Sequence, residues 1–154
     1  MFRKMRKQER EINNMEAVAI LEQGEYGILS TVGKNGYPYG VPVNYVYIND
    51  SIYFHSAVEG NKLDNIMDHN KVSFCVVGQT CVLPEKFSTE YESVILFGAA
   101  SEVFDDEKNT ALLEIVNKYS VEHIEKGKEY IKNASAKTKV IKIHMDHISA
   151  KARR

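Results

Sequence analysis

The sequence predicts a mainly β (α+β) fold, an antiparallel barrel with peripheral helices. β-rich segments follow one another through short turns, without the regular alternation of strands and helices that builds a parallel sheet. Asn35-Gly36 and Asn49-Asp50 are two-residue turn signals of the kind that joins the strands of a hairpin. The 154 residues include only three prolines and no low-complexity linker, so we expect one domain over residues 1–154.

Six segments have strand character: 26–32, 37–48, 51–57, 71–77, 92–104 and 138–148. Pro42 restricts the long segment 37–48 to a sheet edge or a bulge, because proline cannot donate a ladder hydrogen bond. Gly98 is expected to mark a bulge in 92–104, whose two faces are both apolar and should both be buried. The polar segment 78–91 contains Pro84 and is expected to be a loop.

Helical signals lie between these strands. Asn13 and Glu16 form a capping box, and Gly24 is the residue expected just past the end of that helix, in the left-handed conformation. A short helix should end near Asn70, and a third should follow the acidic run 105–107, with a weaker charged helix over 121–133. The expected buried faces are Ala17, Ile20 and Leu21; Leu63, Ile66 and Met67; and Leu112, Ile115, Val116 and Tyr119.

The composition is that of a globular protein without a strong electrostatic partner. With 44% hydrophobic residues, 27% charged residues and a net charge of −1, the chain has no overall attraction to nucleic acid or to a membrane surface. No apolar run reaches the roughly 18 residues of a membrane-spanning helix, and the start lacks the apolar core of a signal peptide, so a cytoplasmic location is expected. Cys75 and Cys81 should then be free thiols.

The first ten residues form a basic arm, in which Arg3, Lys4, Arg6, Lys7 and Arg10 carry the charge. Such an arm could bind nucleic acid, or it could be a solvated tail or a segment packed on a partner subunit. Glu9 and Glu11 interrupt the charge and no aromatic platform accompanies it, which favours the second interpretation.

Signatures of self-sufficient catalysis are missing. The chain has no Gly-x-Ser-x-Gly, no Gly-x-Gly-x-x-Gly, no Walker loop, no His-Glu-x-x-His and no cysteine pair with zinc spacing. We therefore expect no metal site, and a nicotinamide would not sit on a Rossmann unit. A bound cofactor would have to supply the reactivity.

The most informative segment is the predicted hairpin over 37–57 and the Gly60-Asn61-Lys62 run that follows it. A glycine and a lysine at a helix start favour an anion, because the backbone N–H groups and the helix dipole face it, and this indicates a phosphorylated cofactor. The plain alternative for Lys62 is a surface lysine. His55 could hydrogen-bond a cofactor or a substrate, or be a half-buried polar group. Ser56 and Asn44 could hydrogen-bond the cofactor, or be ordinary strand residues.

The chain resembles the FMN-binding split barrels of the pyridoxamine-phosphate-oxidase-like superfamily, and within it the nitroimidazole reductase (nitroimidazole resistance) family. The residues that carry the resemblance are Met1-Phe2-Arg3, Gly36 to Tyr39, Val41 to Val43, Tyr53 to Ala57, Gly60 with Lys62, Lys71 to Val77, Pro84 to Phe87 and Ser93 to Gly98. The resemblance implies an antiparallel split β-barrel and a homodimer with FMN at the interface. It also implies a small-molecule substrate and NADH or NADPH as a possible electron donor.

By the same resemblance, the cofactor-binding residues are Pro42, Val43, Asn44, Tyr45, His55, Ser56, Ala57, Asn61, Lys62 and Ser93, with Ser93 reaching the flavin from the other subunit and His55 as the candidate catalytic residue. Asn61 stands where nitroimidazole reductases commonly have histidine, and asparagine cannot act as a general acid. We expect an FMN-dependent oxidoreductase acting on small flat acceptors such as nitroaromatics. The alternatives are a flavin-binding or redox-sensing protein without turnover and a haem-binding split barrel.

Overall fold

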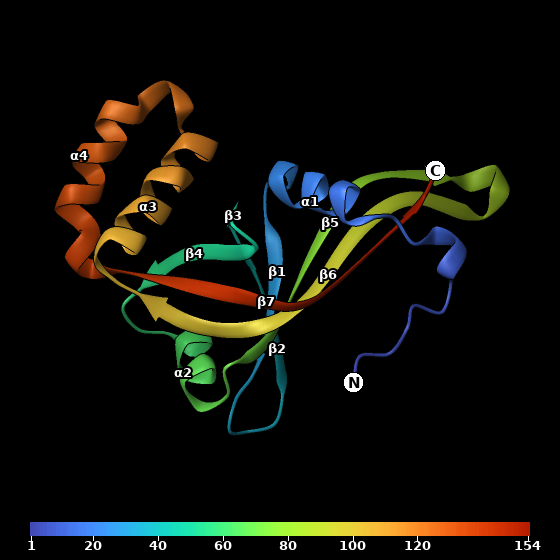
Figure 1. The fold of residues 1–154 in the computed structure, drawn as a ribbon, viewed down its shortest axis with the longest axis horizontal. Coiled ribbons are helices and arrows are strands. Elements are labelled where there is room, and N and C mark those ends of the chain that lie inside the picture. Colours follow the sequence, from blue (N-terminus) through green and yellow to red (C-terminus); the bar gives the residue numbers. More distant parts are fainter.

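Seven strands form one antiparallel sheet in the computed structural model, which describes residues 1–154 (Figure 1). The order is β2-β1-β5-β6-β7-β4-β3, and every neighbouring pair is antiparallel. The strands are β1 (Gly27–Val32), β2 (Pro38–Val43), β3 (Val46–Ile48), β4 (Ser51–Ala57), β5 (Lys71–Leu83), β6 (Ser88–Val103) and β7 (Thr138–Arg153). The predicted antiparallel fold is confirmed, with seven strands instead of six.

The β2–β3 connection shows why this sheet is a split barrel. β2 and β3 lie at opposite edges of the sheet, yet only Asn44 and Tyr45 separate them in sequence. A two-residue link spans at most about 10 Å, so the sheet must curl until its two edges lie close together. The edges are not hydrogen-bonded to each other, which leaves the barrel open along this seam. The prediction of one continuous strand over 37–48 is therefore wrong, whereas the edge position of Pro42 is confirmed.

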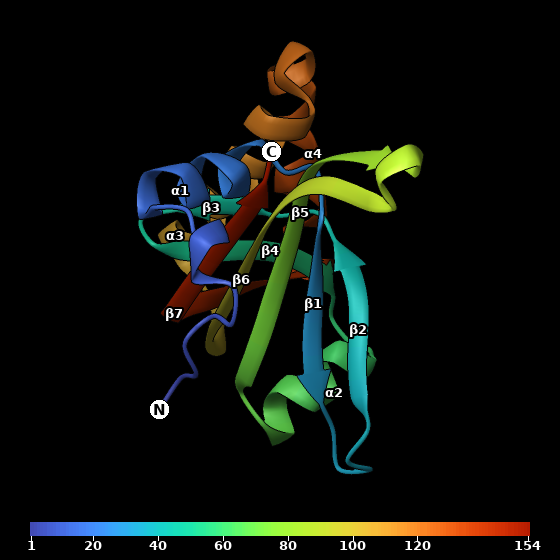
Figure 2. The ribbon, with the colours of Figure 1, turned by 90° about the vertical axis from the view of Figure 1, so that its right-hand side faces the viewer.

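Two apolar clusters fill the fold. The larger lies inside the curled sheet and includes the fully buried Leu29, Phe54, Phe74, Leu96 and Ile143. α1 (Asn14–Gln23) and α2 (Asn61–Asp68) pack at opposite ends of this core (Figures 1 and 2). The smaller cluster lies where α3 (Asp105–Tyr119) covers β3 and β4, and α4 (Ile124–Ala134) packs on α3. No helix is both long and apolar enough to cross a membrane.

α1 begins as the sequence predicts but ends for a different reason. Asn13 accepts a hydrogen bond from the Glu16 N–H at 2.9 Å, the Glu16 carboxylate accepts one from the Asn13 N–H, and the predicted face is buried. Gly24, however, has φ −61°, so it is not left-handed. A Cβ at Gly24 would collide with the Tyr45 hydroxyl and lie 2.6 Å from Val76 Cγ1. Glycine is needed here for close packing.

Residues 78–91 are not the expected loop. β5 and β6 continue as a hairpin arm, paired from Thr80 opposite Tyr91 to Leu83 opposite Ser88, which projects beyond the barrel (Figure 1). At its tip Phe87 is 97% exposed and has φ +48°. The arm carries one of the two cysteines, Cys81, and both are free as expected.

The expected irregularity at Gly98 is present, with the extra residue in the neighbouring strand. Phe97 pairs with His147 and Gly98 with Met145, so Asp146 has no partner across the ladder. A Cβ at Gly98 would collide with the His144 carbonyl oxygen, which explains why only glycine fits. The bulge also places His144, opposite Ala99, on the same face as His147, although a spacing of three predicts opposite faces.

The other predicted helices form with small differences in extent. Leu63 and Ile66 are buried in α2 as expected, but Met67 is 84% exposed and does not belong to the buried face. Acidic residues fill the first turn of α3, as predicted. β7 continues five residues past the predicted end at 148, to Arg153.

Candidate functional site

The end of β4 and the start of α2 bring half of the predicted site residues together. His55, Ser56 and Ala57 are the last residues of β4, and Asn61 and Lys62 open α2 after three intervening residues. Between them Gly60 has φ +150°, a conformation that few other residues adopt, and it turns the chain from the strand into the helix. The first backbone hydrogen bond of α2 runs from the Asp64 N–H to the Gly60 carbonyl at 3.1 Å. The N–H groups of residues 61–63 therefore remain available to a ligand.

The local charge favours an anion on the Lys62 side of this helix. Lys62 is half-buried and forms no ion pair. Asp64, in the same turn, lines a separate hollow with Lys34 and Asn35. Residues i and i+2 of a helix do not face each other, so the carboxylate does not cancel the Lys62 charge directly.

His55 is held in its neutral form at this junction. His55 is exposed at the end of β4, but neighbouring atoms remove part of its hydration, which lowers the pKa of His55, and the positive charge of Lys62 lowers it further. At neutral pH its imidazole therefore offers one N–H donor and one nitrogen acceptor, without a positive charge. Ser56 points to the opposite face of β4, where it is buried and its hydroxyl donates to the Ala57 carbonyl at 2.7 Å.

The β2–β3 link reaches the same region through its backbone. Val46 pairs with Tyr53, and continuing this register brings Asn44 level with His55. Pro42 and Asn44 are exposed and Val43 is half-buried, whereas the Tyr45 side chain is fully buried and its hydroxyl donates to the Leu21 carbonyl. The Tyr45 ring is therefore part of the core, and only the backbone of Tyr45 could contact a ligand at this link.

Ser93 is separate from the other candidate residues within one chain. It pairs with Lys151 of β7, whereas His55 pairs with Val140 of the same strand. Eleven residues of β-strand correspond to about 35 Å along β7. Within one molecule Ser93 and His55 therefore cannot contact the same small ligand.

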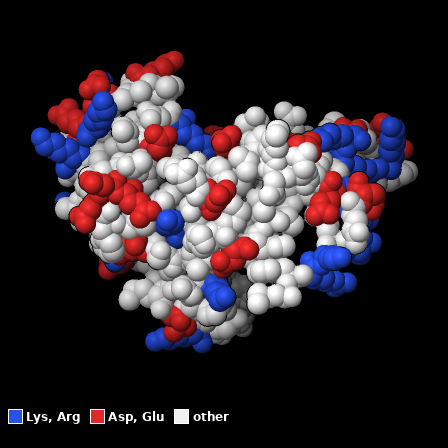
Figure 3. Space-filling model, viewed as in Figure 1, with Lys and Arg blue, Asp and Glu red and all other residues white.

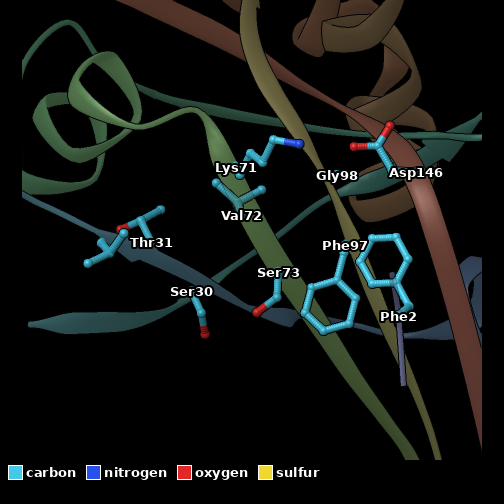
Figure 4. A pocket seen from close by; sticks show the side chains of 10 residues that line it. Phe2, Ser30, Thr31, Lys71, Val72, Ser73, Phe97, Gly98 and Asp146 are labelled. Atoms are coloured by element: carbon cyan, nitrogen blue, oxygen red, sulfur yellow. The ribbon is translucent and has the colours of Figure 1, made fainter. Parts of the chain in front are cut away.

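A hollow of about 300 Å³ lies on the outer face of the sheet, away from the β4–α2 junction. Figure 4 shows the Phe2 and Phe97 rings side by side, with Lys71 and Asp146 along one edge of the hollow. The Phe2 ring also stacks on His147, with 4.4 Å between the ring centroids. Phe2 covers this face only in part, because Phe97 is still 40% exposed in the single chain. The expectation that both faces of the 92–104 strand are buried therefore does not hold within one molecule.

The basic N-terminal arm lies against its own chain. Glu11 pairs with Lys151, the Ile12 N–H donates to the Ala150 carbonyl at 3.0 Å, and Arg10 donates to the Tyr91 hydroxyl at 3.4 Å. Acidic and basic residues are interspersed over the face in Figure 3, without a continuous basic surface. This arrangement gives no support to a nucleic-acid arm.

Two residues fix the β2–β3 link although no sequence pattern predicts this role for them. Lys118 Nζ donates to the Tyr45 carbonyl at 2.9 Å and lies 3.9 Å from the centre of the Tyr45 ring. The hydroxyl of Tyr119 lies within hydrogen-bonding distance of both the N–H and the carbonyl of Tyr45. The sequence assigns Tyr119 to a buried helical face and gives no signal that the end of α3 meets residue 45.

Comparison with known proteins supports the fold seen here. The family model described as pyridoxamine 5′-phosphate oxidase matches residues 13–152. A search of curated proteins found no match.

Solved structures with the same fold include proteins with different cofactors. A candidate 5-nitroimidazole antibiotic resistance protein from Bacteroides thetaiotaomicron is 24% identical, with a TM-score of 0.74 over 92% of this chain and 86% of the other. An FAD-binding protein from Mesorhizobium loti is 23% identical, with a TM-score of 0.67 over 94% and 98%. The FAD and haem binding protein from Mycobacterium smegmatis is 16% identical, with a TM-score of 0.82 over 94% and 74%. Because the family model covers almost the whole chain and these structures share its split barrel, the chain belongs to the pyridoxamine 5′-phosphate oxidase family.

Proposed function

We propose that this chain binds FMN and acts, as a homodimer, as an FMN-dependent oxidoreductase that reduces small flat acceptors such as nitroaromatics. The observation that carries the proposal is the start of α2, where available N–H groups lie beside Lys62, whose positive charge also acts on His55. A phosphate dianion suits this donor set, because it accepts several hydrogen bonds and favours the positive end of a helix. The family and the flavin-binding proteins among its structural relatives support a flavin at this position.

The residues of the chain would hold and orient the cofactor. Lys62 and the first N–H groups of α2 would bind the phosphate, and the Asn44 amide and the His55 N–H would reach the ribityl chain or the ring. The flavin, when bound, would supply the electron transfer. His55 is neutral at pH 7 and Asn61 does not titrate, so neither is a strong proton donor. We therefore expect slow turnover of acceptors whose reduction requires proton transfer in its first step.

A second subunit would complete the site in this proposal. The uncovered outer face of β5, β6 and β7 exposes 38% of Ile95 and 40% of Phe97, which suits a contact between two copies. Ser93 lies on the same strand as these residues and would reach the flavin of the other copy. Electrons would come from NADH or NADPH.

A haem-binding function is the second candidate. It is favoured by His147, an imidazole flanked by Phe2 on the outer face, because histidine is a common axial ligand of haem iron. One of the structural relatives binds both FAD and haem.

The absorption spectrum of the purified protein, before and after addition of NADH or NADPH, separates these functions. A flavin spectrum that bleaches supports the oxidoreductase, and a flavin spectrum that does not bleach supports a binding protein without turnover. A Soret band supports haem. A colourless protein that takes up no added FMN would contradict the flavin proposal.

A further inference from the structure

A cavity of about 130 Å³ lies where α3 and α4 separate from each other above β4 and β7. Its walls are mainly apolar and come from both helices: Leu112, Ile115 and Val116 from α3, and Tyr130, Ile131 and Ala134 from α4. None of the α4 residues is fully buried, although the helix has a clear apolar face. The apolar face of α4 therefore borders the cavity and is not fully packed against α3.

Contacts at both ends keep the cavity from collapsing. At one end Gly127 lies against Val116, so close that a Cβ on Gly127 would be 2.5 Å from Val116 Cγ1. At the other end Lys108 Nζ donates to the Ser135 carbonyl at 2.9 Å, and the Thr138 hydroxyl donates to the Ala134 carbonyl at 3.0 Å. The helices are thus fixed before and after the gap, and they cannot close over it without breaking one of these contacts.

His55 is one of three side chains at this cavity without a hydrogen bond, together with Ser135 and with Tyr130, which is 73% exposed. The Thr138 hydroxyl and the Ser135 carbonyl are already hydrogen-bonded, whereas the His55 side chain has no hydrogen bond. Because the imidazole is neutral at pH 7, it provides a donor and an acceptor at the edge of an apolar space.

We propose that this cavity binds a neutral single-ring aromatic compound with one hydrogen-bonding group, of the phenol class. At about 130 Å³ the cavity is close in size to an apolar cavity of about 150 Å³ that holds benzene, whereas drug-sized ligands need about 300 Å³ or more, so a flavin ring does not fit. The apolar walls exclude a charged ligand, and His55 bonds the hydroxyl. His55 belongs both to this cavity and to the proposed flavin site. The proposal that the cavity binds a phenol does not depend on flavin binding.

Phenol titration of the purified protein, followed by the methyl NMR signals of Leu112, Ile115, Val116 and Ile131, tests this proposal. We expect saturable shifts confined to these methyl groups. Ala134→Leu places a larger side chain in the cavity and should weaken phenol binding at least 10-fold. Asn133→Leu, which adds the same side chain on the exposed side of α4, is the matched control and should bind phenol as the wild type does. Thermal unfolding of both variants checks that the fold is retained.

His55→Leu tests the hydrogen bond separately. It should weaken phenol binding by about 2- to 10-fold, the effect of one neutral hydrogen bond, and leave benzene binding unchanged. An equal loss for both compounds would overturn the role of His55.

The absence of saturable binding, or equal phenol affinity in the wild type and Ala134→Leu, would overturn the site itself. If Ala134→Leu loses FMN together with phenol, the cavity is part of the flavin site and the proposal of a separate site is wrong. If the wild type binds phenol but not FMN, the flavin proposal alone is contradicted.

Discussion

The hydroxyl of Tyr119 accepts a hydrogen bond from the backbone N–H of Tyr45 at 3.0 Å, although the two residues are 74 positions apart. The same oxygen lies 3.1 Å from the Tyr45 carbonyl and within bonding distance of the Glu25 carbonyl, to either of which it can donate its single proton. Tyr45 stands where the chain crosses the open seam of the barrel, so its backbone lacks strand partners. The end of α3 thus replaces the missing ladder at this point.

Tyr119→Phe should lower the free energy of unfolding by about 1–3 kcal/mol, because it leaves the Tyr45 N–H without an acceptor. Urea unfolding measures the change. Tyr130→Phe is the control, since Tyr130 is 73% exposed and its hydroxyl forms no hydrogen bond, and it should change stability by less than about 0.5 kcal/mol. Equal effects of the two substitutions would show that the Tyr119 hydroxyl does not support the seam.

Lys118 makes the free energy of unfolding depend on pH. Burial lowers the pKa of Lys118 from 10.5 to about 8. Between these values the unfolded chain binds more protons than the folded one, so the contribution of Lys118 to the free energy of unfolding rises with pH, and below pH 8 it is constant. Wild type should therefore gain stability relative to Lys118→Met from pH 8 upward. Lys128→Met, at an exposed position, should show no such trend in urea unfolding. Parallel pH curves for wild type and Lys118→Met would contradict the lowered pKa.

Lys62→Ala should weaken FMN binding by about 1.5–3 kcal/mol, the range for a hydrogen bond to a charged group. Titration of the cofactor-free variant with FMN measures the loss. Lys62→Arg should retain most of the affinity, and Lys126→Ala, on the exposed surface of α4, should retain all of it. Unchanged FMN affinity in Lys62→Ala would remove the phosphate from the start of α2.

Asn61→His should accelerate nitroimidazole reduction more than it changes FMN affinity, because it adds a group that can donate a proton near neutral pH. Single-turnover reactions of pre-reduced protein compare the two forms without the reductive half-reaction. Rapid reduction by the wild type, together with no effect of Asn61→His, would show that position 61 does not limit proton delivery. If neither form reoxidises faster than free reduced FMN, the protein binds flavin without turnover.

Ile95→Lys should shift the protein from dimer to monomer, since it places a charge on the uncovered outer face of β6. Sedimentation velocity of wild type and variant measures the change. Val121→Lys, at a position that is 62% exposed between α3 and α4, should leave the assembly unchanged. A wild-type monomer that binds FMN tightly would refute the shared site.

The sequence predicted those elements whose signals are local. The capping box of α1, the Asn49-Asp50 turn, where both residues have positive φ, and the glycine at the start of α2 each depend on neighbouring residues only. For the same reason, the contiguous part of the candidate site, from His55 to Lys62, could be placed at one strand–helix junction.

The failures have long-range causes. The break at Asn44–Tyr45 is stabilised by Lys118 and Tyr119, which no local pattern connects to it. The β5–β6 arm buries neither face, so the apolar alternation that reveals strands is missing from residues 78–91. The cavity beside His55 depends on how far α3 and α4 separate after Gly127, and helical periodicity does not specify that distance.

The position of β7 between β6 and β4 has a consequence for biosynthesis. β4 joins the sheet only through β7, and Ala57 pairs with Thr138, which the ribosome adds about eighty residues later. At 5–20 residues per second this delay is roughly 4–16 s. Throughout it one edge of β4 has no partner strand, and Ile52 and Phe54 lack the part of their core that β7 supplies. The nascent chain is therefore most prone to aggregation and to chaperone capture while it carries β4 but not yet β7.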